Sequence, residues 1–114
     1  MAGRSFTDTH VAEAAKVRAT AVALVDELLA DGAVLCFPTT PAPAPPVGEP
    51  QSVRRPLAAR ISALTCVTGT TGCPQINLPL AEVVGLPLGL SLIGAKGSDE
   101  SLIAFARQVE AACA

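Results

Sequence analysis

The sequence predicts an α/β fold with about three helices and three strands. Apolar residues recur at three- and four-residue steps in three long segments, as they do on one face of a helix. Three shorter apolar runs, one of them alternating with polar residues, have the length of strands, and glycine or proline separates the segments. At 114 residues and 11.5 kDa the chain is long enough for one domain, which would expose roughly 5,800 Å² if compact.

The first half of the chain predicts a helix, a strand and a proline-rich loop. The helix covers residues 8–31, with Asp8 or Thr9 to cap its start and Gly32 to end it. The apolar stripe expected to be buried on it consists of Val11, Ala14, Ala15, Val22, Val25, Leu28 and Leu29. Residues 33–37 form a short apolar run that predicts a buried strand, parallel to its neighbours. Residues 38–56 hold seven prolines and predict a loop, either a linker or a rigid loop at the carboxyl end of a strand.

The second half predicts a helix, two strands and a last helix. Residues 57–68 have helical spacing, residues 75–80 alternate as a strand, and residues 86–93 form another strand. The short spacer between these strands predicts an antiparallel return. Ser98 or Asp99 can cap the last helix. Its expected buried stripe consists of Leu102, Ala106, Val109 and Cys113.

Charge is scarce and unevenly distributed. The net charge is −2 and the longest basic cluster is Arg54–Arg55, which excludes a basic nucleic-acid-binding surface. Residues 61–95 contain one charged side chain, Glu82. Glycines and prolines interrupt this stretch too often for a membrane-spanning helix, so we expect buried strands whose covering layers are partly missing. An open sheet edge of that kind predicts self-association or pairing with a partner chain.

The start of the chain and its cysteines indicate a cytoplasmic protein. Residues 1–10 are polar and lack the apolar stretch of a secretory signal. The four cysteines form no C-x-x-C pair and His10 is far from them in sequence, so no metal site is expected. We expect all four thiols to be buried and reduced.

The residues themselves predict no catalytic centre. Ser91 lies inside a predicted strand, in a G-x-S-x-x-G spacing that differs from a nucleophile elbow. The segment from Gly89 to Lys96 differs from a phosphate-binding loop, because Ala95 occupies the place of the required lysine.

The order of several short segments resembles the C-terminal part of an amidase-signature enzyme. The segments are Phe37–Pro41, Leu64–Thr65, Gly72–Pro79, Leu86–Gly94, and Gly97–Asp99 with Leu102. The resemblance covers nearly all of residues 1–114. It implies a C-terminal portion of an α/β/α fold with a mixed central sheet, and hydrolysis of a small-molecule amide to a carboxylate and ammonia or an amine, without a metal or organic cofactor.

The resemblance also implies that the catalytic core segment is absent from this chain. That family uses a lysine and two serines in a Gly/Ser-rich segment, and no such segment occurs here. We therefore expect no catalytic residue in this chain and no activity from it alone. Thr39, Thr65 and Thr68 are the candidates for a substrate-pocket wall, unless each threonine bonds only its own backbone. The alternatives are the amidase subunit of a tRNA-dependent amidotransferase and a non-catalytic α/β module that pairs with a partner chain.

Overall fold

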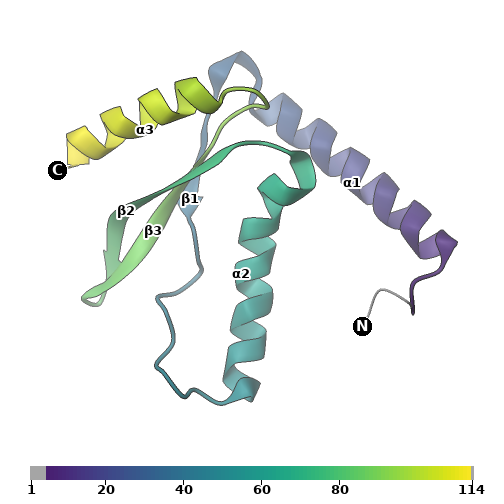
Figure 1. Ribbon diagram of the computed structural model, residues 1–114, viewed down its shortest axis with the longest axis horizontal. Coiled ribbons are helices and arrows are strands. Elements are labelled where there is room, and N and C mark those ends of the chain that lie inside the picture. The colour runs from purple at the N-terminus through teal and green to yellow at the C-terminus, as the bar shows by residue number, and fades with distance from the viewer. Residues whose placement is uncertain (1–4, 114) are drawn as a thin grey trace.

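The structure is a computed structural model that describes residues 5–113. In chain order its elements are α1 (Asp8–Leu28), a short 3-10 turn η2 (Ala30–Gly32), β1 (Leu35–Pro38), α2 (Gln51–Thr71), β2 (Gln75–Val83), β3 (Leu86–Ile93) and α3 (Asp99–Cys113). Within the described residues, three helices and three strands confirm the predicted α/β class (Figure 1).

The three strands form one antiparallel sheet with β3 in the middle. The order is β1-β3-β2, and Ser91 of β3 lies opposite Phe37 of β1 on one side and Asn77 of β2 on the other. The antiparallel return from β2 to β3 is confirmed, but the prediction that the first strand is parallel to its neighbours is wrong. The long loop and α2 carry the chain around before β2 and β3, so the strand that pairs with β1 arrives from the opposite direction (Figure 1).

Helices cover both faces of the sheet. On one face, Val25 of α1 and Leu29, which caps that helix, pack with Cys73 and Ile93, and Val67 of α2 joins this cluster. On the other face, two buried residues of α3 pack against two buried leucines of the sheet: Leu102, Ala106, Leu78 and Leu92. The alternation of side chains along β3 explains the division, because Leu92 and Ile93 point to opposite faces.

The first helix begins at residue 8 as predicted but ends at Leu28 instead of residue 31, and the structure corrects its expected cap and buried stripe. The capping residue is Thr7, whose hydroxyl accepts the His10 N–H at 3.3 Å while His10 Nδ1 accepts the Thr7 N–H. Helix α1 contacts the sheet only near its C-terminal end (Figure 1). Of the seven expected core residues, only Val25 and Leu29 are buried, whereas Val11 and Leu28 are 61% and 51% exposed.

Helix α2 begins earlier than predicted, inside the proline-rich segment. Pro50 precedes its first turn, and the Pro50 carbonyl accepts the N–H groups of Val53 and Arg54. Pro56 lies within the helix, so the expectation of a loop up to residue 56 is wrong. Proline at this early position forgoes one hydrogen bond, to the Ser52 carbonyl, and leaves the rest of the helix intact.

The predictions for the strands and for the last helix agree more closely with the structure. Strand β3 has the expected bounds, β1 is shifted to residues 35–38, and β2 continues to Val83 past an irregularity in register between Leu78 and Ala81. On α3, Leu102 and Ala106 are buried as expected, Val109 is half-buried, and the prediction of a buried Cys113 is wrong.

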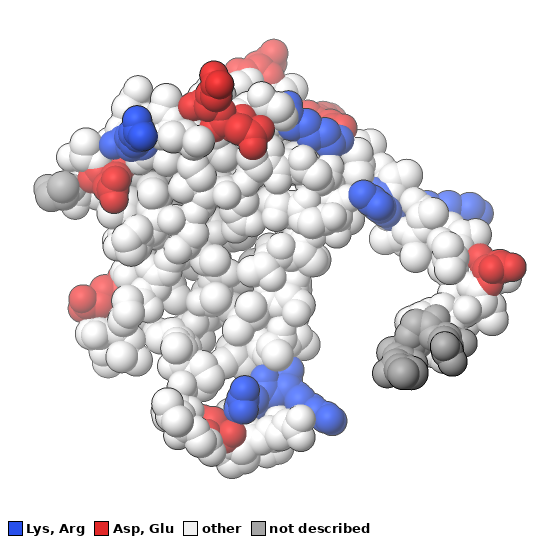
Figure 2. All heavy atoms as spheres, viewed as in Figure 1, with Lys and Arg blue, Asp and Glu red and all other residues white. Residues whose placement is uncertain are grey.

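The molecule is open and flat rather than compact. It measures 50 × 43 × 18 Å, and its radius of gyration is 16.8 Å, against about 13 Å for a compact chain of this length. Charged side chains lie over α3, along α1 and at the end where α2 begins, and the surface between α3 and the start of α2 is nearly free of charge (Figure 2). The openness also exposes three of the four cysteines expected to be buried, since only Cys73 is buried and the exposed ones are Cys36, Cys66 and Cys113.

Candidate functional site

A network of uncharged polar side chains links α2 to the sheet, on the face that α1 and α2 cover. Ser91 is at its centre and is fully buried. Its Oγ lies 2.7 Å from Thr39 Oγ1 and accepts a hydrogen bond from Gln75 Nε2 at 2.6 Å. Thr39 Oγ1 also donates to Asn77 Oδ1, and Thr68 Oγ1 donates to Gln75 Oε1 at 3.1 Å. We call these five residues the hydroxyl–amide network.

The pairing of the strands places three members of the network side by side. Asn77 and Ser91 are direct partners across β2 and β3, so their side chains lie on the same face. Thr39 follows β1 and extends the pairing, because its N–H donates to the Gly89 carbonyl at 2.8 Å. Glycine at position 89 leaves room for Asn77, since a Cβ there would force the Asn77 side chain to move.

A tight connection between α2 and β2 brings the other two members, Thr68 and Gln75, into contact. Helix α2 ends at Gly72, which has a left-handed conformation with φ of 78°, and its N–H donates to the Thr68 carbonyl at 2.7 Å. A left-handed cap of this kind favours glycine because other residues meet a steric penalty there. The chain then turns directly into β2, which sets Gln75 beside Thr68.

The structure joins two of the three predicted pocket-wall threonines and leaves out the third. Thr39 and Thr68 belong to the hydroxyl–amide network, and both are half-buried. Thr65 lies one turn earlier on α2, is exposed, and donates to its own helix at the Ile61 carbonyl at 3.0 Å.

Sequence reasoning missed the other three members, Gln75, Asn77 and Ser91. The signal that could have identified them is present, because Gln75 and Asn77 alternate with apolar residues in a predicted strand and Ser91 is the polar residue of the next strand. Combining that alternation with the expected antiparallel pairing would have placed all three on one face.

The chemistry available to the network is hydrogen bonding without proton transfer. Its members are hydroxyls and carboxamides, which donate and accept hydrogen bonds but remain neutral near pH 7. No lysine, histidine or carboxylate of the described residues hydrogen-bonds to any of the five, so the buried hydroxyl of Ser91 has no general base beside it there. This arrangement can hold a neutral polar group and fix the end of the sheet.

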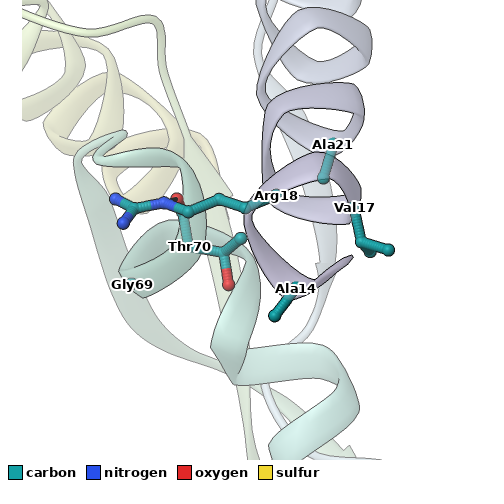
Figure 3. Close-up of a pocket in the computed structure, with 6 residues that line it drawn as sticks. All are labelled: Ala14, Val17, Arg18, Ala21, Gly69 and Thr70. Carbon is teal, nitrogen blue, oxygen red and sulfur yellow. Dashed lines mark hydrogen bonds between the residues drawn. The ribbon is translucent and has the colours of Figure 1, made fainter. Parts of the chain in front are cut away.

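A cleft of about 490 Å³ lies between α1 and the C-terminal end of α2 (Figure 3). Its lining residues are Ala14, Val17, Arg18, Ala21, Gly69 and Thr70, and none of the predicted threonines is among them. Arg18 Nε reaches across and donates to the Thr70 carbonyl at 2.9 Å, near the helix end where a positive charge is favourable. The cleft thus offers mainly small apolar side chains.

Within residues 5–113, no three side chains of His, Cys, Asp or Glu are arranged to hold a metal ion. No helix in the same range has the length and apolarity needed to cross a bilayer. The expectation about residues 1–10 rests partly on residues 1–4, which lie outside the described residues.

Comparison with known proteins gives concordant results. The chain is 33% identical over 87 residues to Amidase 1 of Oryza sativa subsp. japonica, a match that covers 76% of this chain and 20% of that protein. It is 34% identical over 107 residues to a glutamyl-tRNA(Gln) amidotransferase subunit of Streptococcus pyogenes, covering 93% of this chain and 22% of that protein. A crystal structure of an amidase superposes with a TM-score of 0.81 and 27% identity, over 99% of this chain and 27% of that one.

The chain spans about a fifth of the length of the curated relatives that it matches. The family model described as Amidase matches residues 2–103, which is most of the chain. The sequence motifs, the fold and these matches agree, and the chain belongs to the amidase family.

Proposed function

We propose that this chain is a C-terminal segment of an amidase, which hydrolyses a carboxamide to a carboxylate and ammonia or an amine. The observation that carries the proposal is the family match over residues 2–103, with the superposition on a solved amidase as support. The reacting groups, two serines and a lysine, come from a segment outside this chain. There, one serine attacks the amide carbonyl, the second moves a proton between the lysine and the nucleophile, and backbone N–H groups stabilise the oxyanion.

In this proposal the chain supplies part of the pocket wall. Thr39 and Thr68 hold their hydroxyls at the half-buried edge of the hydroxyl–amide network, and Thr65 adds an exposed hydroxyl one turn along α2. A wall of neutral donors and acceptors suits an uncharged carboxamide, because a bound charge there would lose water without gaining an opposite charge. The isolated chain is expected to have no amidase activity.

A chimera tests the proposal. The chain replaces the matching stretch of the rice Amidase 1, and release of ammonia and carboxylate is measured over a panel of simple amides. We expect turnover of at least one amide. Replacing Thr39, Thr65 or Thr68 by valine removes a hydroxyl at nearly constant shape and should lower kcat/KM by about 3- to 10-fold, the value of one hydrogen bond.

The matched control is Thr20→Val. Thr20 is an exposed threonine of α1 whose hydroxyl bonds its own helix at the Lys16 carbonyl, as Thr65 bonds the Ile61 carbonyl. The Thr20→Val substitution should leave kcat/KM unchanged. A folded chimera that is inactive on every amide contradicts the proposed function. An active chimera whose kcat/KM is lowered by none of the three valine substitutions contradicts the pocket wall.

A second candidate is a role in a tRNA-dependent amidotransferase. The match to the Streptococcus pyogenes amidotransferase protein covers 93% of this chain, more than the match to the rice protein. Under this alternative the ammonia released by the complete enzyme would pass to a partner that forms a new amide. A chimera built on the Streptococcus protein that hydrolyses glutamine and no other amide in the panel would favour it.

A further inference from the structure

The three threonine hydroxyls of the proposed pocket wall all donate their protons inside the protein. Thr68 Oγ1 donates to Gln75 Oε1 at 3.1 Å, and Thr65 Oγ1 donates to a carbonyl of its own helix at 3.0 Å. Thr39 Oγ1 donates to Asn77 Oδ1. A hydroxyl has one proton and two lone pairs, so none of the three has a proton left for a ligand.

The buried hydroxyl of Ser91 fixes the direction of its hydrogen bond to Thr39. Ser91 Oγ already accepts an N–H of Gln75 at 2.6 Å, and Thr39 Oγ1, at 2.7 Å, is its other side-chain partner among the described residues. Ser91 is fully buried, and a buried hydroxyl keeps its proton in a hydrogen bond. Ser91 therefore donates to Thr39, and the hydrogen bonds run in one direction from Gln75 through Ser91 and Thr39 to Asn77.

The lone pairs of the threonines are what this wall offers to a ligand. Thr39 keeps one lone pair after accepting from Ser91, and Thr65 and Thr68 keep two each. Thr65 and Thr68 lie three residues apart on α2 and share one side of that helix, and Gln75 and Ser91 link Thr68 to Thr39. Thr65 is exposed and the other two threonines are half-buried, so a ligand can reach all three.

We propose that the three threonines select amides that carry a second, neutral hydrogen-bond donor, an N–H or O–H group, in the part of the molecule that lies against them. The inference rests on the proposed function and names the substrate class of the same site. A group with lone pairs alone, such as an ether oxygen, would face the lone pairs of the threonines with no proton between them. A charged ammonium group also donates, but the five residues of the hydroxyl–amide network include no carboxylate to balance its charge.

Asn77 is the positioning residue that this inference identifies. Its Oδ1 accepts the proton of Thr39 and so keeps that proton away from a ligand. Asn77→Leu preserves the approximate volume of the side chain and removes the acceptor. The Thr39 hydroxyl can then donate to a bound ligand, so a substrate that offers lone pairs alone gains a partner.

The experiment uses the chimera with the rice Amidase 1 and matched pairs of phenylacetamides. The members of each pair carry a hydroxyl or a methoxy group at the same ring position, 2, 3 or 4, so that one member donates a hydrogen bond and the other accepts without donating. The value of kcat/KM is measured for both members, and Kd is measured by calorimetry for any pair that is not hydrolysed. We expect the hydroxyl member to be preferred by about 10-fold at one or more ring positions.

The substitution at Asn77 tests the direction of the hydrogen bonds. Asn77→Leu should reduce the preference for the hydroxyl member by at least about 3-fold. A loss of folded protein would lower both members of a pair equally and leave their ratio unchanged, and the larger size of the methoxy group cancels when the two ratios are compared. The matched control is Gln108→Met, which replaces an exposed carboxamide of α3, on the opposite face of the sheet, and should leave the preference unchanged.

The outcomes separate this inference from the proposed function. If the chimera hydrolyses amides but prefers no hydroxyl member, or if Asn77→Leu reduces the preference no more than Gln108→Met does, selection by the threonines is wrong and the amidase proposal stands. If the chimera is inactive but binds the hydroxyl members more tightly, and Asn77→Leu reduces that difference, the selection is established although the amidase proposal fails. An inactive chimera that binds both members equally, or binds neither, overturns both.

Discussion

Replacing Gly89 by alanine should destabilise the protein through one neighbour, Asn77. The three atoms nearest to an added Cβ at this position all belong to the Asn77 side chain, and they lie closer than real Cβ contacts allow. Asn77 must therefore rotate away and release the hydrogen bond that it accepts from Thr39.

The expected magnitude follows from two opposing contributions. Because Asn77 is exposed, its side chain can move into solvent, and the cost is the lost hydrogen bond from Thr39, about 1 kcal/mol. Alanine is better than glycine inside a strand by about 0.5–1 kcal/mol, which offsets part of that cost. The net loss for Gly89→Ala is about 0.5 kcal/mol, or about 2 °C in Tm for a chain of this length. In an Asn77→Ala background the obstruction is gone, so the same Gly89→Ala substitution should stabilise the protein by about 0.5 kcal/mol.

A double-mutant cycle in urea measures both effects. The protein contains no Trp or Tyr, so unfolding is followed by far-ultraviolet circular dichroism at low concentration rather than by fluorescence. We expect a coupling free energy of about 1 kcal/mol between Gly89 and Asn77. Equal effects of Gly89→Ala in the two backgrounds would refute the argument, because the cost would then come from the backbone and not from Asn77.

Three further predictions concern single positions. Ser91→Ala removes the centre of the hydroxyl–amide network and should cost about 1–3 kcal/mol in urea unfolding, since Gln75 loses its acceptor; a loss below about 0.3 kcal/mol would mean that water replaces the hydroxyl. Val84→Asn should stabilise the protein by about 1 kcal/mol in thermal unfolding, because Val84 has φ of 52° in a two-residue hairpin turn where asparagine is favoured; an unchanged Tm would contradict this. With a thiol reagent, Cys73 should react only on unfolding while the other three cysteines react at once, and four equal rates would contradict the buried position of Cys73.

The bounds of the strands were the best predicted part of the fold, and the direction in which β1 pairs was the least well predicted. Residues 86–93 have the bounds expected from the sequence, because alternation and flanking turn residues act locally. The direction in which β1 pairs depends on the path of the chain through α2, which no local pattern of residues 33–37 contains. Proline also misled the prediction, since Pro56 near the start of a helix costs only one hydrogen bond.

The candidate site was predicted only in part, because its contacts also depend on the path of the chain in space. Thr39 and Thr68 were identified from a family resemblance, but their connection through Gln75 and Ser91 depends on three segments meeting in space. Thr65 has the same residue type and lies on the same helix as Thr68, yet it bonds its own backbone because no partner side chain lies within its reach among the described residues.

The sequence by itself determined the α/β class, the antiparallel β2–β3 return and membership of the amidase family, because local periodicity and ordered short motifs carry that information. Only the tertiary structure decided which apolar residues are covered. Leu28 and Leu29 are neighbours in one apolar helix segment, but Leu29 is 2% exposed and Leu28 is 51% exposed. The physical reason is that periodicity identifies an apolar face, whereas burial requires a second surface against it, and the sheet reaches only one side of α1.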